Sequence, residues 1–122
     1  MRDFRKYDVW RLAIDFASDI YNVSNLFPIF EKYALSSQLC RAVVSISSNI
    51  AEGSARSSDI DFCRFLEIAI GSAFEVETQL IIAHRLNYID DDTFHKLLSQ
   101  NQTIERKINN LIQTIKNPTS TN

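Results

Sequence analysis

The stretch from Ser58 to Asn87 restricts the possible folds of this chain more than any other segment. Its apolar residues return at alternating steps of four and three: Phe62, Leu66, Ala69, Ala73, Val76, Leu80 and Ala83. A seam of this period over three heptads is typical of α-helices that pack together at a small angle. Ser58 and Asp61 have the spacing of an N-cap and its partner. The sequence therefore predicts a helix over about 59–87.

Three other segments carry the same helical period, and we expect helices at about 8–24, 37–55 and 91–116, with a polar tail over 117–122. Pro28 ends the first segment, and a short turn over 29–33 leads into the second. Gly53 is expected to close the second helix in a left-handed conformation, and Asp90 or Asp91 to cap the last. The small residues from Ala69 to Ala73 are expected to let another helix approach closely.

The chain has only two glycines and two prolines among 122 residues, too few breakers for the many turns of an all-β fold. Four long helices with short connections fit this composition. The predicted fold class is all-α: one domain over 1–122, an antiparallel up-and-down four-helix bundle.

The charge balance argues against a broadly cationic surface, because the formal net charge is −2 and the basic residues are dispersed. Cys40 and Cys63 are expected to be buried, reduced thiols. We find no signal-peptide pattern and no apolar run of transmembrane length. The expectation is a cytoplasmic protein without membrane attachment.

A polar stripe follows the predicted helix over 37–55. At about 100° per residue, Gln38, Arg41, Ser45, Asn49, Glu52 and Arg56 fall in one narrow sector beside the apolar face. The next helix offers Ser72, Glu75 and Gln79 as partners. Three interpretations stay open: mutual hydrogen bonding across a helix or subunit contact, a ligand or RNA site made from Arg41, Asn49 and Glu52, or a solvated face.

A second apolar stripe on the helix over 59–87 consists of Cys63, Ile70, Phe74, Ile81 and Tyr88. Ile68, Ile82 and Leu86 add apolar surface on a further side. A helix that is apolar nearly all round is expected to be buried nearly all round. The five residues of this second stripe are therefore the candidates for an interface between subunits of a homo-oligomer.

Motifs of known chemistry are missing from the sequence. No glutamate has a histidine three residues later, so the di-iron pattern of helical bundles is absent. His84 and His95 stand alone, and there is no phosphate-binding glycine loop or nucleophile elbow. We expect no enzyme activity, no catalytic residues, no metal and no cofactor.

Three blocks of the sequence resemble the 23S-rRNA intervening-sequence proteins, a four-helix bundle family. These are Gln38 to Gly53, Phe65 to Ser72 followed by Glu75, and Phe27-Pro28 with Glu31 and Leu35. The similarity extends from about residue 9 to 115. It implies an up-and-down bundle that assembles into a homopentamer with a central channel. Some members are encoded within 23S rRNA genes. A related member, the basic accessory protein of diversity-generating retroelements, binds nucleic acid and a reverse transcriptase.

Two functions follow as hypotheses. The first is an oligomeric interaction or scaffold protein, in which Asn49→Leu or Glu52→Ala weakens folding or assembly. The second is an RNA- or DNA-binding accessory protein that depends on Arg2, Arg5, Lys6 or pooled arginines. The acidic net charge disfavours the second, because attraction to phosphate scales with the cations that a protein presents.

Overall fold

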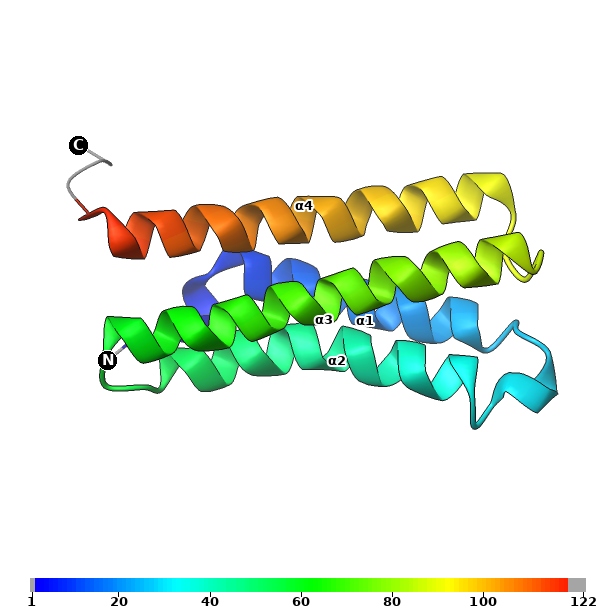
Figure 1. Ribbon diagram of the computed structural model, residues 1–122, viewed down its shortest axis with the longest axis horizontal. Coiled ribbons are helices and arrows are strands. Elements are labelled where there is room, and N and C mark those ends of the chain that lie inside the picture. Colours follow the sequence, from blue (N-terminus) through cyan, green and yellow to red (C-terminus); the bar gives the residue numbers. More distant parts are fainter. Residues whose placement is uncertain (1, 119–122) are drawn as a thin grey trace.

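The computed structural model describes residues 2–118. These residues form four α-helices and no strand: α1 (Asp8–Ser24), α2 (Leu35–Ser54), α3 (Asp59–Arg85) and α4 (Asp91–Lys116) (Figure 1). Two short 3-10 helices, η1 (Phe4–Lys6) and η2 (Ile29–Glu31), precede α1 and α2. The predicted all-α class with four helices is confirmed. Of the predicted polar tail, residues 119–122 lie outside the described part.

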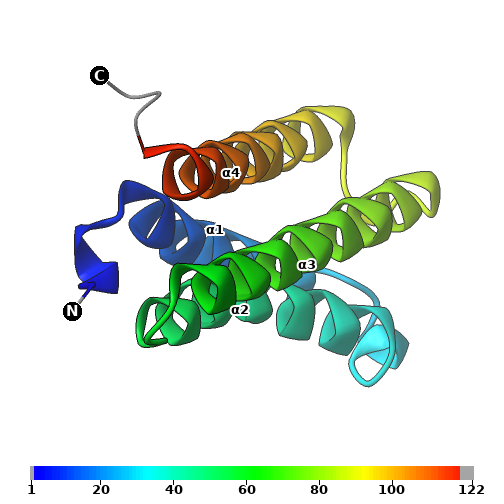
Figure 2. The ribbon, with the colours of Figure 1, turned by 60° about the vertical axis from the view of Figure 1, so that its left-hand side comes forward.

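The helices lie side by side along one long axis, and each turns back along the one before it (Figure 1). Helix α2 packs on α1 and α3, and α4 packs on α3 and α1. Within residues 2–118, neither α1 and α3 nor α2 and α4 make a close contact, so α4 stands on the far side of the molecule from α2 (Figure 2). The core between the helices includes the fully buried side chains of Phe16, Ile46, Phe62, Leu66 and Ile108.

The helix ends follow from local chemistry. The Ser58 hydroxyl accepts a hydrogen bond from the Asp61 N–H at 3.1 Å, and the Asp90 carboxylate accepts one from the Thr93 N–H at 2.7 Å. Both side chains occupy N-cap positions, as predicted. Helix α3 ends two residues earlier than expected because Asn87 adopts a left-handed conformation, with φ of 63°.

Gly53 has a different role from the predicted one. It lies inside α2, and no glycine has a positive φ. A Cβ atom at this position would lie 2.6 Å from the Phe65 Cβ atom and 3.3 Å from the Phe62 carbonyl oxygen. Glycine is therefore required here for the close approach of α2 to α3. Gly71, which was expected to serve such a contact, is exposed, and a Cβ atom added there would meet nothing within 4 Å.

No helix in the described part of the chain combines the length and the apolar character needed to cross a membrane.

Candidate interaction surface

A hydroxyl contact joins the middle of α2 to the middle of α3. The Ser45 and Ser72 Oγ atoms lie 2.8 Å apart, and Asn49 donates to the Ser45 Oγ atom at 2.9 Å and to the Ser45 carbonyl oxygen at 2.8 Å. Ser72 is buried, and Ser45 and Asn49 are half-buried. Two residues of the predicted polar stripe and one of its predicted partners thus satisfy one another at a helix contact.

The other members of the stripe do not join this contact. Gln38, Arg41, Glu52 and Glu75 are exposed. The Arg56 guanidinium lies over the Phe65 ring, 4.5 Å from its centroid. The side chain of Gln79 is buried, and its Oε1 atom has no hydrogen-bond partner among the described residues. Ser45, Asn49 and Ser72 therefore form a hydrogen-bonded centre. The exposed part of the stripe consists of Gln38, Arg41, Glu52 and Glu75.

We expect Ser45→Ala to lower the free energy of unfolding by about 1 kcal/mol, because it removes the hydroxyl that both Ser72 and Asn49 contact. Ser72 keeps a bond to the Ile68 carbonyl oxygen and Asn49 keeps one to the Ser45 carbonyl oxygen, which limits the loss. Glu52 is exposed, so Glu52→Ala is not expected to weaken folding as the sequence suggested; it is the control on the same helix and should stay within about 0.5 kcal/mol of the parent. Urea unfolding followed by circular dichroism measures both. Equal midpoints for the two variants would contradict the structural role of the hydroxyl contact.

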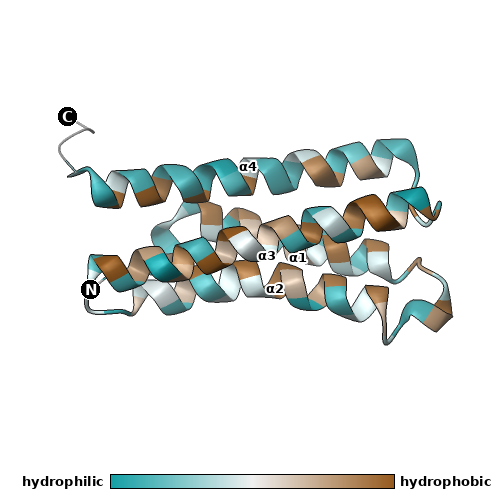
Figure 3. Ribbon diagram, viewed as in Figure 1, coloured by the Kyte–Doolittle hydropathy of each residue, from teal (hydrophilic) through white to brown (hydrophobic). Residues whose placement is uncertain are grey.

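Helix α3 exposes large apolar side chains on the side that faces away from the core. Ile60, Ile68, Phe74, Ile82 and Leu86 are all exposed, and α3 shows hydrophobic bands where α4, seen from the same side, is mostly hydrophilic (Figure 3). Of the five residues predicted for a subunit interface, only Phe74 belongs to this outward side. Cys63 is buried in the core, and Ile70, Ile81 and Tyr88 are half-buried against it. These four residues expose less surface than Phe74 does, and their place in a subunit interface stays a prediction.

The exposed part of the polar stripe and the outward side of α3 meet in a shallow groove of about 310 Å³. We call this surface the α2–α3 face and define it by Gln38, Gly71, Phe74, Glu75 and Ile82, which line the groove. At Gly71 no side chain covers the backbone of α3, which leaves room for the groove. A face with an apolar middle and polar neighbours has the composition of a protein–protein interface.

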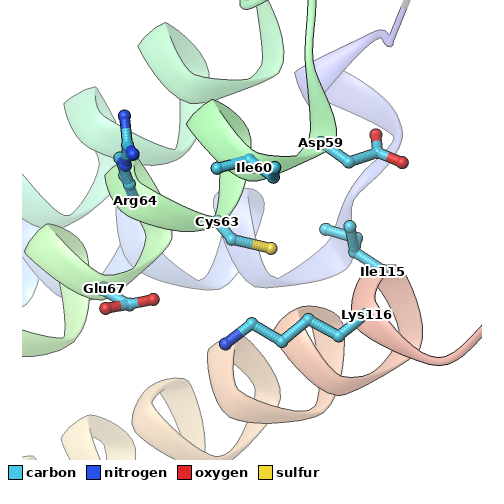
Figure 4. A pocket seen from close by; sticks show the side chains of 7 residues that line it. All are labelled: Asp59, Ile60, Cys63, Arg64, Glu67, Ile115 and Lys116. Carbon is cyan, nitrogen blue, oxygen red and sulfur yellow. The ribbon is translucent and has the colours of Figure 1, made fainter.

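A second hollow, of about 520 Å³, lies between the start of α3 and the end of α4. The Cys63 side chain points into it, and Lys116 and Ile115 border it from α4 (Figure 4). Burial raises the pKa of the Cys63 thiol, with the Lys116 charge opposing this effect. A raised pKa disfavours the reactive thiolate, so this cysteine is suited to packing and not to nucleophilic chemistry. Cys40 is half-buried, and both cysteines are free.

Two carboxyl groups meet at the contact of α3 with α4. Burial raises the pKa of Glu105, and the neighbouring Glu77 carboxyl, which lies within hydrogen-bonding reach, raises it further. Asn101 lies beside them, fully buried, and donates to the Ala73 carbonyl oxygen at 2.9 Å. No sequence motif marks this cluster, because its members come from two helices and only the packing brings them together.

Glu105→Gln is expected to stabilise the protein at neutral pH by a few °C in Tm. The folded-state pKa of Glu105 is raised, so the favourable contribution of the protonated group is present below about pH 4.5 and is lost as the pH rises through the folded-state value. Above its folded-state pKa, Glu105 carries a negative charge that destabilises the fold, and the glutamine amide removes that charge. Thermal melts across this range should show a larger gain at neutral than at acidic pH. Glu67→Gln, at an exposed position, is the control, and an equal gain there would contradict the pairing.

The sequence of the chain matches a known protein family over most of its length. The family model of the 23S rRNA-intervening sequence proteins matches residues 5–110. The chain belongs to this family. The match contains α1, α2 and α3 entirely and most of α4, so it includes every residue of the α2–α3 face. The predicted resemblance is confirmed.

One solved structure has the same fold as this chain. It is a protein of unknown function from the S23 ribosomal protein family of Bacteroides thetaiotaomicron, with 28% sequence identity and a TM-score of 0.79. The similarity covers 87% of this chain and 99% of the other. No curated protein matches this chain.

In the present chain, His84 contacts the Asp91 carboxylate at 2.6 Å. Its ring stacks on the Phe94 ring, with 4.2 Å between the centroids. The contact ties the end of α3 to the start of α4. Within residues 2–118, no group of histidine, cysteine, aspartate and glutamate side chains has the arrangement of a metal site. The exposed surfaces of α2 and α3 are the functional candidates.

Proposed function

We propose that this protein is a non-enzymatic scaffold: an antiparallel up-and-down four-helix bundle that assembles into a homo-oligomer, a pentamer, and presents its outer surfaces to protein partners in the cytoplasm. The observation that carries the proposal is the outward side of α3, where Phe74 is 56% and Ile68 53% exposed in the isolated chain. Contiguous exposed apolar surface usually marks an interface.

The α2–α3 face supports this assembly in two further ways. Gly71 leaves the backbone of α3 accessible, so that a neighbouring helix can come close. Glu75 and Gln38 flank the apolar centre and supply the polar rim that such interfaces have. The pentamer itself rests on the family resemblance of the sequence.

The nucleic-acid alternative has less support. Arg2 is paired with Asp59, Arg5 with Asp3, and Lys107 with Asp8. Cations that are already paired add little to phosphate affinity, and the net charge of the chain is −2. We therefore retain the scaffold as the proposed function.

Size-exclusion chromatography with light scattering, together with native mass spectrometry, tests the proposal at protein concentrations of about 1–10 μM, where specific interfaces of ordinary affinity are occupied. The expected mass is five times that of the chain. A monomer mass would overturn the assembly. Retention of structured RNA at low salt, lost steeply as salt rises, would favour the nucleic-acid alternative.

A further inference from the structure

The connection between α1 and α2 carries the most exposed apolar side chains among the described residues. Ile29 is 88%, Tyr33 87%, Leu26 79% and Phe30 73% exposed. We call these four residues the tip. The connection lies at the end of the molecule opposite η1 and the end of α4 (Figure 1), and it includes hydrophobic residues in Figure 3. Four large apolar side chains of this exposure in one short segment form an unusual patch for a free surface.

A groove of about 540 Å³ runs beside the tip, between the end of α1 and the start of α2. Its apolar walls include Tyr21, Phe27 and Ile29. The Ser24 Oγ and Cys40 Sγ atoms, 3.3 Å apart, also border it. The groove is thus large enough for the side chains of a peptide and joins directly onto the tip.

The charges on this groove have one sign. Lys32 and Arg41 line it, and no acidic residue of the described chain does. The Lys32 ammonium lies over the Tyr33 ring, 5.4 Å from its centroid, which places the charge beside the tip. In a chain of net charge −2 this is a local exception.

The start of α2 borders the groove. Its N-cap residue, Ala34, gives no side-chain hydrogen bond, and Ser36 and Ser37 of the first turn line the groove. A helix start carries about half a positive charge, which the Glu31 carboxylate offsets here. Glu31, the acid of the connection, is held by the Tyr88 hydroxyl at 2.8 Å and by the Leu35 N–H at 3.4 Å. Its carboxylate is thereby engaged by α2 and by the chain that follows α3.

We propose that the tip and its groove bind an acidic segment of a partner protein that carries apolar anchor side chains. The exposed apolar tip and the apolar groove walls match the anchors, and Lys32 and Arg41 match the carboxylates. A nucleic-acid strand fits less well, because two cations neutralise few phosphates. This groove adjoins the α2–α3 face on α2, where Ser37 lies next to Gln38, but the two share no lining residue, so the proposal does not depend on the oligomer.

Fluorescence anisotropy with the full chain tests the proposal. The probe is a labelled peptide in which leucines alternate with aspartates, and its partner probe carries asparagine at every aspartate. We expect saturable binding of the acidic probe, at least about tenfold weaker binding of the asparagine probe, and a similar loss in Lys32→Glu/Arg41→Glu. Ile29→Ser/Phe30→Ser should lose binding of both probes. Lys96→Glu, at an exposed site on α4, should bind like the parent.

Each other result overturns the proposal. No saturable binding, or equal binding by parent and Lys32→Glu/Arg41→Glu, removes the acidic partner. Tighter binding of a labelled uridine oligomer than of the acidic peptide would indicate nucleic acid. A lower oligomer mass in Ile29→Ser/Phe30→Ser would indicate that the tip contacts a second copy of the chain. Circular dichroism melts of all variants check that the fold is intact, as expected for exposed positions.

Discussion

Gly53→Ala is expected to destabilise the fold by about 2 kcal/mol, close to 10 °C in Tm. The added methyl group would lie 2.6 Å from the Phe65 Cβ atom and 3.0 Å from a ring carbon of Phe62. A Cβ atom is fixed to its backbone, so α2 and α3 would have to separate. The better helix propensity of alanine, worth about 1 kcal/mol, opposes this cost and is already subtracted.

Gly71→Ala is the matched control, because it makes the same change at an exposed position of α3 with nothing within 4 Å. There the propensity gain acts alone, and we expect stabilisation by about 1 kcal/mol. Since Gly71 belongs to the α2–α3 face, both glycine variants are compared in the Phe74→Asp/Ile82→Asp background, which removes assembly from the measurement. Urea unfolding gives the two values. Equal effects of the two substitutions would contradict the close approach of α2 to α3 at Gly53.

The helices were predictable because their signals are local. Ser58 and Asp90 cap α3 and α4 through residues three positions away, and the apolar period extends over neighbouring turns. The predicted end of α3 was two residues too late, because the left-handed backbone conformation of Asn87 ends the helix earlier. Gly53 shows the limit of this reasoning: its place near a helix end suggested a cap, and only the position of Phe65 on the next helix explains it.

The sequence could not predict which sides of α3 are covered by other helices of the chain and which are exposed. Cys63, Ile70 and Ile81 form an apolar stripe, but a helical period does not distinguish residues packed within the chain from residues left outside. The same limit applies to the tip. Pro28 marked a helix end, but the sequence did not predict that Leu26 is 79% and Phe27 6% exposed. Leu26 points outward, and Phe27 packs on the Tyr88 ring.

Phe74→Asp/Ile82→Asp is expected to convert the proposed oligomer into a folded monomer of 14.0 kDa. Both side chains are exposed in the single chain, so the helices should form as before. Each aspartate would be buried without a partner in an assembly that uses the α2–α3 face, at a cost of several kcal/mol. Light scattering should show the change of mass, and circular dichroism an unchanged helical spectrum.

The controls separate the α2–α3 face from the other apolar surfaces. Phe30→Asp makes the same kind of change at the tip and should keep the mass of the parent. Ile81→Asp should lower Tm, because Ile81 packs against the core of its own chain. If Phe74→Asp/Ile82→Asp keeps the parent mass while Phe30→Asp dissociates, the subunits meet at the tip, and the apolar outward side of α3 requires a different partner.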